Sequence, residues 1–406
     1  MTTTVNNEHK NIKVPNLRFP EFQGEWEVES IKDVADFMGG GTPSSSNESF
    51  WQGTIPWISS SDIVENDIKN ISISRYITEE AIAHSATKLC PAPSILIVSR
   101  VGVGKIALSK EAICTSQDFC NLINIKVEPI FLTYCLSQIM KRKSMEVQGT
   151  SIKGITTSEI QKISINIPSL QEQKKIGKIL SLLDERIATQ NKIIDKLQSL
   201  IKGLNDFLYT QYGGEVLTSF AELGTSYSGL SGKSAQDFGS GKPFITYLNV
   251  YSNNVIKEND FQYVAIKDDE KQNVVKYGDV LFTLSSETPE EVGVGSVYLG
   301  KEKVYLNSFC FGIHITNTEV AFPPYLSYYV SLTAFRKFIY PYAQGSTRFN
   351  LCKADFEKAS IKLPTLADQK RIYSVLGHID CKIETERQML NLYNSQKQYL
   401  LRQMFI

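Results

Sequence analysis

Hydrophobic residues recur along this chain in two long heptad seams, with spacings that alternate between four and three residues. The first seam consists of Ile176, Leu180, Leu183, Ile187, Gln190, Ile194, Leu197, Ile201, Leu204 and Leu208, and the second of Ile372, Leu376, Ile379, Ile383, Glu386, Leu390, Tyr393, Lys397, Leu400 and Met404. Such sustained alternation predicts a coiled coil rather than an ordinary amphipathic surface helix. Both seams carry a polar residue at the same position, Gln190 and Glu386, which can fix the register of a pair at some cost in stability.

Two seams of equal length in one chain predict two helices that pack on each other. About 33 residues at a rise of 1.5 Å per residue correspond to a rod of roughly 50 Å. Antiparallel pairing would place one globular domain at each end, related by a pseudo-two-fold axis. The alternative is that each helix packs only on its own domain.

The segments that precede the seams repeat as well. QGTSIKGI from Gln148 is followed by ISINIPSLQEQKKI from Ile163, and QGSTRFNL from Gln344 is followed by ASIKLPTLADQKRI from Ala359. Both pairs are 196 residues apart, from 148 to 344 and from 163 to 359. VGVGKIAL from Val101 also matches VGVGSVYL from Val292. The chain therefore reads as a tandem duplication, which suits two related surfaces held at a set separation.

Between these features, short β-rich runs alternate with Gly, Pro and Ser turns, which predicts mixed α/β (α+β) globular domains. Strands are expected at 54–58, 71–73, 95–98, 105–108 and 122–127, and again at 244–250, 280–284, 296–299 and 309–315. One further helix is expected in each copy, beginning at Phe131 and at Tyr325. The predicted parts are an N-terminal arm (1–20), a first globular domain (21–170), a central long helix (171–212), a second globular domain (213–366) and a C-terminal long helix (367–406).

Composition narrows the possible classes of protein. With 406 residues, 42% hydrophobic and 21% charged, the chain is typical of a globular protein of two or three domains. No apolar run is long enough to cross a bilayer, and the polar start MTTTVNNEHK lacks the apolar core of a signal peptide. The seven cysteines include no C-x-x-C pair, so they are expected to be reduced and buried rather than disulfide-bonded or metal-binding. We therefore expect a cytoplasmic protein without a membrane partner.

The charge and the missing catalytic patterns predict a binding protein. The formal net charge is zero, so any DNA-binding function must rest on local features or on partners. Four scattered histidines and the lack of an H-E-x-x-H or Cys/His cluster predict no metal site. GLSGKS from Gly229 fails as a P-loop because Tyr227 lies where the first glycine belongs, and GSGKP from Gly239 fails because of Pro243. The glycines of VGVGK are better explained as turn residues, and no Asn-Pro-Pro-Tyr methyltransferase motif is present.

In combination, these motifs resemble the specificity subunit of type I restriction–modification enzymes. The motifs that carry the resemblance are IPSLQEQKKI from Ile167 and LPTLADQKRI from Leu363, each between a Q-G-T/S loop and a long helix. The opening VPNLRFPEFQGEW and the stretch GGGTPSSSN…WQGTIPWISSSDI fit the first target-recognition domain of that family. The resemblance covers nearly the whole chain.

The resemblance implies two target-recognition domains that each read one half of a split, asymmetric site in double-stranded DNA. It implies that the two long helices act as a ruler between the halves. It also implies that the chain itself has no catalysis and no cofactor. Its implied partners are two methyltransferase subunits, which use S-adenosylmethionine, and motor–nuclease subunits, which use ATP and Mg.

Residues that read DNA are expected to be donors and acceptors on loops that reach base edges. The candidates in the first domain are Thr42, Ser44, Ser45, Ser59, Ser60, Ser61, Arg100, Lys105, Gln148, Thr150, Ser151 and Lys153. Those in the second domain are Ser228, Lys233, Tyr247, Asn249, Ser285, Ser286, Gln344, Ser346, Thr347 and Arg348. Each could instead be a solvated turn residue. The Q-G-T/S loops are favoured as a group because the repeat preserves them, whereas Arg100 has no basic counterpart near Ser285 in the sequence.

Two other functions stay open on the sequence alone. The chain could be a coiled-coil scaffold with two protein-binding heads and no affinity for nucleic acid. It could also be the specificity subunit of a related system in which one bifunctional partner both methylates and cuts DNA.

Overall fold

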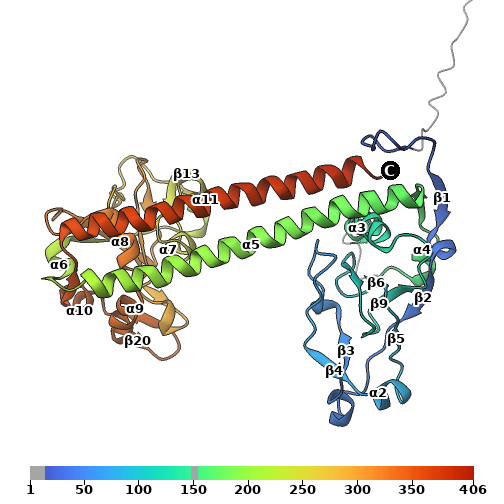
Figure 1. Ribbon diagram of the computed structural model, residues 1–406. Coiled ribbons are helices and arrows are strands. Elements are labelled where there is room, and N and C mark those ends of the chain that lie inside the picture. Colours follow the sequence, from blue (N-terminus) through green and yellow to red (C-terminus); the bar gives the residue numbers. More distant parts are fainter. Residues whose placement is uncertain (1–13, 148–153) are drawn as a thin grey trace, which may run out of the picture. The chain divides into compact units, whose positions relative to one another are not determined.

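The computed structural model describes residues 14–147 and 154–406. The chain divides into two compact units, the first made of Met1–Gln190 with Met389–Ile406 and the second of Asn191–Gln388. Two long helices, α5 (Leu170–Tyr212) and α11 (Leu366–Gln403), each contribute one segment to either unit (Figure 1).

The first unit is a mixed α/β structure. Its strands are β1 (Glu27–Ser30), β2 (Asp36–Gly39), β3 (Ile55–Ile58), β4 (Arg75–Ile77), β5 (Leu89–Cys90), β6 (Ser94–Val98), β7 (Ile106–Ser109), β8 (Ile113–Thr115), β9 (Phe119–Ile123) and β10 (Ser164–Ile167). Its shorter helices are α1 (Ile31–Val34), α2 (Glu79–Ala83), α3 (Pro129–Val147) and α4 (Thr157–Gln161), with 3₁₀ turns η1 (Glu48–Trp51) and η2 (Ser60–Asp62).

The central strand β6 explains how the first unit builds its core. All five of its residues are buried. Ile95 and Ile97 belong to the hydrophobic cluster that includes α3, whereas Leu96 and Val98 belong to the cluster that includes Ile58 of the neighbouring sheet. Successive side chains of a strand point to opposite faces, so both faces of this sheet are covered. The continuous apolar run ILIV follows from that burial.

The second unit contains a comparable set of elements. Its strands are β11 (Val216–Thr218), β12 (Gly224–Ser228), β13 (Phe238–Ile245), β14 (Gln262–Val264), β15 (Val280–Thr283), β16 (Ser285–Ser286), β17 (Gly295–Val297), β18 (Tyr305–Leu306), β19 (Cys310–Ile315), β20 (Ala343–Gly345), β21 (Phe349–Leu351) and β22 (Ile361–Leu363). Its shorter helices are α6 (Phe220–Leu223), α7 (Tyr247–Ser252), α8 (Pro323–Tyr329), α9 (Thr333–Ile339) and α10 (Lys353–Lys358), with 3₁₀ turns η3 (Ala235–Asp237), η4 (Glu258–Asp260), η5 (Pro289–Glu291) and η6 (Tyr340–Tyr342).

The sheet topology repeats between the units, as the duplicated sequence predicts. The antiparallel sheet β2–β9–β6–β7 corresponds to β12–β19–β15–β17, and the pair β1–β10 corresponds to β11–β22. The sheet β4–β3–β8 corresponds to β14–β13–β18, and in both copies the middle strand pairs antiparallel on one side and parallel on the other. The predicted tandem arrangement of two mixed α/β domains is confirmed.

A buried glutamine explains why the Gln-Lys pair in the first turn of each long helix is repeated. Gln173 donates to the carbonyl of Pro168 (2.8 Å) and accepts from the backbone N–H of Glu128 (2.9 Å), just before α3. Its counterpart Gln369 donates to Pro364 O and Val320 O and accepts from Phe322 N, just before α8. Each glutamine therefore ties the first turn of a long helix to the loop that leads into a second helix.

The N-terminal segment docks on the start of α5. The Arg18 guanidinium donates two hydrogen bonds of 2.8 Å to the carboxylate of Glu172, which is only 1% exposed. Leu17 N donates to Gln403 O at the end of α11 (2.9 Å). The motif VPNLRFPEF thus provides a structural contact within the first unit.

The two seams meet in an antiparallel sense within each unit. In the first unit, Leu180 near the start of α5 shares a hydrophobic cluster with Leu400 near the end of α11. In the second unit, Leu204 near the end of α5 packs in the cluster that contains Leu376 near the start of α11. No residue of either seam is exposed, and Gln190 and Glu386 are both 6% exposed. The predicted antiparallel coiled coil is confirmed.

The helices also pack on the globular parts of the units. The cluster of Ile176, Leu180 and Leu183 includes Phe131 and Leu132 of α3. The coiled coil and packing on the domains are therefore not alternatives, because a buried stripe wider than the two seam positions serves both contacts.

One expected helix is wrong. The pattern from Tyr325 predicts one helix, but the structure has two, α8 and α9. The Asn205 side chain donates to the carbonyl of Tyr328 (2.8 Å) at the end of α8. The Asp206 carboxylate accepts from the N–H of Thr333 (2.9 Å) at the start of α9. Neighbouring side chains of α5 thus satisfy backbone groups on both sides of the break.

Some expected strands also differ. Residues 247–250 form the first turns of α7, because the Thr246 hydroxyl accepts from the Asn249 N–H and the Asn249 side chain accepts from the Thr246 N–H in a capping box. Residues 71–73 form no strand, and Ile71 makes only an isolated bridge to Ile63.

All seven cysteines are free, as expected, but they are not all buried. Cys381 is exposed and Cys352 is half-buried. Cys381 lies on α11 outside the seam, so the helical periodicity places it toward solvent.

Candidate nucleic-acid interface

In the second unit, loop candidates from distant parts of the sequence meet on one small sheet. β16, which is Ser285 and Ser286, pairs antiparallel with β21, and β21 pairs antiparallel with β20. The turn between β20 and β21 carries Ser346, Thr347 and Arg348, all exposed. The repeated Q-G-T/S motif is therefore the first arm of a hairpin whose tip presents polar side chains to solvent.

The glycine of this motif is required by the hairpin. Gly345 has a φ of +149°, and a Cβ atom at this position would lie 2.0 Å from the carbonyl oxygen of Arg348. Any other residue would force the two arms of the hairpin apart. Gln344 precedes the glycine and is exposed, so its amide faces solvent at the same edge.

Arg348 is the most organised side chain at the hairpin tip. Its Nε donates to the Ser285 hydroxyl (2.8 Å). Its Cζ lies 5.2 Å from the ring centroid of Phe309, which is 51% exposed. The sequence contains no basic residue near Ser285, but the fold brings Arg348 there. Phe309 was not among the predicted residues, and a single exposed phenylalanine carries no signal of such a role.

The segment that follows the equivalent loop in the first unit is attached at the equivalent place. Ile155 N donates to Ser99 O (2.8 Å), next to Arg100, and the corresponding Leu351 N donates to Leu284 O (2.9 Å), next to Ser285. Arg100 is exposed. The candidates Gln148, Thr150, Ser151 and Lys153 lie outside the described residues.

A second group in the first unit surrounds the serine run 59–61. The Lys105 ammonium donates to Ser60 O (3.2 Å), and Ser59 forms a capping box with Asp62. Arg75, which the sequence did not single out, donates to the Ser59 hydroxyl (2.7 Å) and to the Asp62 carboxylate. The Arg75 guanidinium also lies 4.6 Å from the centroid of a Trp57 ring. Only Ser61 of the three serines is exposed.

The loop of residues 39–47 presents further polar groups. Thr42, Ser44 and Ser45 are exposed. The Thr42 hydroxyl donates to Gln117, and the Ser44 and Ser46 hydroxyls are 2.8 Å apart. The indole of Trp51 donates to Ser44 O (3.1 Å), which holds the loop in place.

Four of the five remaining candidates of the second unit are buried or half-buried, and only Ser228 is exposed. Lys233 forms an ion pair with Glu270, and its side chain is only 7% exposed. Asn249 is 4% exposed, and its amide nitrogen donates to Asp260 while its oxygen takes part in the capping box of α7. Tyr247 is half-buried on the same helix, and burial raises its pKa. Ser228 is exposed at the end of β12. Ser286 is buried and donates to Glu291.

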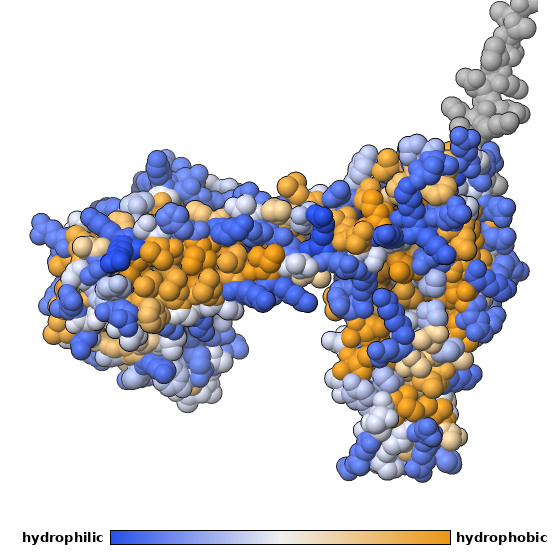
Figure 2. Space-filling view, viewed as in Figure 1, coloured by the Kyte–Doolittle hydropathy of each residue, from blue (hydrophilic) through white to orange (hydrophobic). Residues whose placement is uncertain are grey.

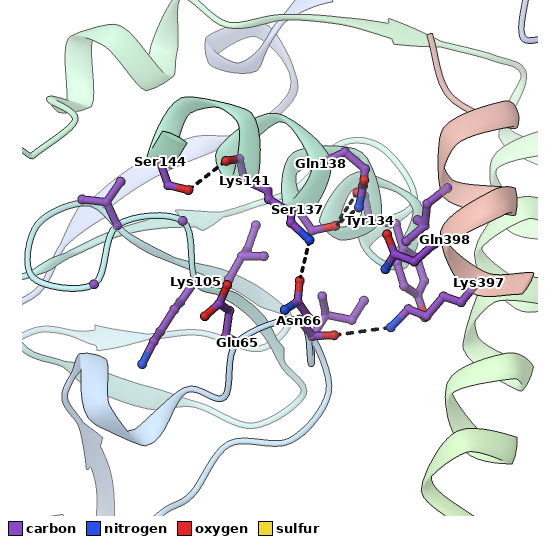
Figure 3. A pocket seen from close by; sticks show the side chains of 16 residues that line it. Glu65, Asn66, Lys105, Tyr134, Ser137, Gln138, Lys141, Ser144, Lys397 and Gln398 are labelled. Carbon is purple, nitrogen blue, oxygen red and sulfur yellow. Dashed lines mark hydrogen bonds between the residues drawn. The ribbon is translucent and has the colours of Figure 1, made fainter. Parts of the chain in front are cut away.

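Lys105 also lines a pocket of about 190 Å³ between the glycine turn after β6, α3 and the C-terminal part of α11 (Figure 3). Gly102 and Gly104 have φ values of +88° and +105°, so the expectation that VGVGK forms a turn is confirmed.

Lys397 lies at the wall of the pocket opposite Lys105 and pairs with Asp184 (2.5 Å). Burial and the Asp184 carboxylate raise the pKa of Tyr134, whose hydroxyl donates to the same carboxylate (2.5 Å).

This ion pair explains why one seam position is a lysine. Lys397 corresponds to Ile201 in the first seam at the offset of 196. In the second unit, Tyr328 donates to Asp380, which matches the contact of Tyr134 with Asp184. The duplication therefore retains the tyrosine–aspartate contact in both units, whereas the lysine is added in the first unit alone.

Within residues 14–147 and 154–406, no group of three or more His, Cys, Asp or Glu residues could hold a metal ion. None of the helices in this described part is both long and apolar enough to span a bilayer.

Comparisons with known proteins give a consistent picture. The profile of the type I restriction modification DNA specificity domain matches residues 23–199 and 224–392. The MjaIX type I restriction enzyme specificity subunit of Methanocaldococcus jannaschii is 33% identical over 183 residues, which are 43% of this chain and 42% of that protein. The EcoR124I/EcoR124II specificity subunit of Escherichia coli is 35% identical over 178 residues, 41% of this chain and 43% of that protein. The matches thus span less than half the length of these two relatives.

Among solved structures, the crystal structure of a type I restriction–modification S subunit from M. genitalium aligns with a TM-score of 0.55 and 14% identity. The alignment covers 97% of this chain and 99% of that one. At this identity the likeness concerns the fold, and it extends over both units.

Proposed function

Since this chain belongs to the family of type I restriction–modification DNA specificity proteins, we propose that each unit reads one half of a bipartite site in double-stranded DNA. Proteins of this kind are non-catalytic components of restriction–modification complexes, so the chain is not an enzyme. The observation that carries the proposal is the exposed polar hairpin of the second unit, whose attachment point recurs beside Arg100 in the first. We assign the recognition domains to residues 21–170 and 213–366, after an N-terminal arm of residues 1–20.

The two half-sites are expected to differ in sequence. The units share strand order, but their exposed groups differ at matching places. Arg100 follows Ser99 in the first unit, whereas Ser285 follows Leu284 in the second and binds Arg348 instead. Base-edge contacts specify sequence, so different donors on one scaffold support an asymmetric target.

We further propose that the long helices, residues 171–212 and 367–406, set the spacer between the half-sites. α5 has 43 residues, which correspond to a rod of about 65 Å. Half-sites about one helical turn apart, roughly 34–36 Å, face the same side of the duplex. The buried seams support a ruler of constant length, because each helix segment is held by a hydrophobic cluster in its unit.

Recruitment of partner subunits is supported by apolar surface on α5. Ile193, Leu200 and Phe207 follow one another at intervals of seven and are 37%, 52% and 58% exposed. Figure 2 shows apolar surface over α5 in the second unit. Exposed apolar patches mark protein interaction sites. We assign two methyltransferase subunits using S-adenosylmethionine, and motor–nuclease subunits using ATP and Mg, as the partners. Their phosphate contacts would compensate for the zero net charge of this chain.

Methylation mapping of a genome tests the proposal. The chain is expressed with its partner methyltransferase, and the control is the methyltransferase alone. A split adenine-methylated motif that depends on the chain is the expected result. No new modification, with both proteins folded and associated, would favour a protein scaffold. A single partner chain that both methylates and cuts would point to the bifunctional system.

The ruler is tested by inserting one heptad into each helix, after Gln190 and after Gln388. A heptad adds about 10.5 Å, the length of about three base pairs. The spacer of the methylated motif should therefore lengthen by about three base pairs, while both half-sites keep their sequences. The insertion in α5 alone is the control, and it should abolish modification because the seams lose their register. An unchanged spacer in the folded double insertion would refute the ruler.

A further inference from the structure

The Arg348 side chain is held in one orientation by two contacts at the tip of the β20–β21 hairpin. The hydrogen bond from Nε to the Ser285 hydroxyl is 2.8 Å long, and the guanidinium carbon lies 5.2 Å from the Phe309 ring centroid. An arginine side chain has a planar fork of five N–H donors. Ser285 uses the single Nε donor, so the four donors on Nη1 and Nη2 point away from this contact.

The platform under Arg348 belongs to the fold of the second unit. Leu284 N donates to Phe309 O (2.8 Å), and Leu351 N donates to Leu284 O (2.9 Å). Ser285 is 6% exposed, so its hydroxyl is fixed within the sheet. A side chain that is already oriented before binding loses less conformational entropy when it meets its ligand.

Two other arginines that the fold holds in place, Arg336 and Arg75, have their donors occupied. Arg336 donates to the carbonyls of Gly293, Glu290 and Val292 and is a structural residue. Arg75 in the first unit also lies against an aromatic ring, but the Asp62 carboxylate neutralises it. Arg348 differs from both because, among the described residues, no carboxylate or carbonyl is bonded to its terminal nitrogens.

We propose that Arg348 reads a guanine in the half-site of the second unit, with Ser285 and Phe309 as its positioning residues. This assignment rests on the proposed DNA-recognition function and deepens it. Two parallel N–H donors match the O6 and N7 acceptors that guanine presents in the major groove, and no other base shows two acceptors there. The Ser285 contact leaves the end of the fork, with both terminal nitrogens, for that pair.

The test compares the methylated motifs of the full chain and its variants, each with the partner methyltransferase. Arg348→Lys keeps the charge but loses the fork, and Arg348→Ala loses both. Both variants should accept other base pairs at one G·C position of one half-site, with discrimination lowered by about 5- to 150-fold. The other half-site should not change.

Ser285→Ala separates positioning from simple charge. It should relax the same G·C position by a smaller factor, because the arginine remains but its orientation is no longer fixed. Ser240→Ala, an exposed serine on β13, is the matched control and should leave the motif unchanged.

Several outcomes would overturn the assignment. If Arg348→Ala lowered methylation equally at all sites and Arg348→Lys restored it, Arg348 would contact a phosphate rather than a base. If the relaxed position were an A·T pair, or if no position relaxed, guanine reading would be wrong. If the unaltered chain produced no split motif at all, the proposed function would fail instead, which distinguishes the two failures.

Discussion

Replacing Gln369 by leucine should loosen the junction between the second long helix and the segment that leads into α8. The Gln369 side chain is fully buried and makes three hydrogen bonds to backbone groups. It accepts from Phe322 N (2.8 Å) and donates to Val320 O (2.8 Å) and Pro364 O (2.9 Å). Leucine has a similar volume but can replace none of these bonds.

The cost follows from the groups left without partners. An unsatisfied buried donor or acceptor costs about 1–3 kcal/mol, and two of the three groups here lie on half-buried residues, so we expect a loss of roughly 3 kcal/mol for Gln369→Leu. Gln173→Leu leaves two such groups, Glu128 N and Pro168 O, and should cost roughly 2 kcal/mol. The duplication thus supplies two versions of one experiment.

Hydrogen exchange measured by mass spectrometry reports each junction separately. A loss of roughly 3 kcal/mol in a local opening equilibrium corresponds to exchange that is about 100-fold faster. Peptides around Phe322 should show this acceleration in Gln369→Leu, and peptides around Glu128 should show a smaller one in Gln173→Leu. Gln171→Leu and Gln388→Leu change exposed glutamines of the same helices and serve as controls.

The test rests on each variant accelerating exchange only at its own junction. Unchanged exchange around Phe322 in Gln369→Leu would show that the three hydrogen bonds do not hold this junction. Acceleration of similar size around both Phe322 and Glu128 in either variant would mean that the glutamines act through global stability instead.

Two further predictions concern buried groups. Lys397→Met should destabilise the first unit by about 3 kcal/mol, because it leaves the Asp184 carboxylate, whose side chain is only 13% exposed, without its cation; Asp184→Asn added to it should recover part of the loss in urea unfolding, and full additivity of the two changes would contradict the pairing. Iodoacetamide should label exposed Cys381 in the native chain well before Cys135, because the thiolate reacts and burial both shields Cys135 and raises its pKa to about 12. A shift from pH 7 to pH 9 should leave Cys135 unlabelled, and comparable labelling of both thiols, read by peptide mass spectrometry, would show that the first unit opens readily.

Features with a regular period could be predicted from the sequence. The heptad seams follow from contiguous residues of single helices, because the 3.6-residue period places every third and fourth side chain on one face. The offset of 196 residues predicted that both halves share one fold, and the strand orders agree. The buried run ILIV was recognisable as a strand because it is a short, β-branched apolar run bounded by turn residues. Lys397 shows where periodicity stops being sufficient. It occupies a seam position that would be expected to be apolar, and only the tertiary structure reveals the Asp184 partner that explains it.

The remaining features depend on contacts between distant segments. One helix was expected from Tyr325, and the break after α8 exists because Asn205 and Asp206 of α5 bond to its backbone groups. The candidate DNA-binding loops could be named from their polar residues, yet nothing local indicated that Arg348 lies on Ser285, 63 residues earlier in the chain. Periodicity is a property of neighbouring residues and is written in the sequence. The pairing of a donor with one particular acceptor is decided only when packing brings the two segments together and excludes water from their contact.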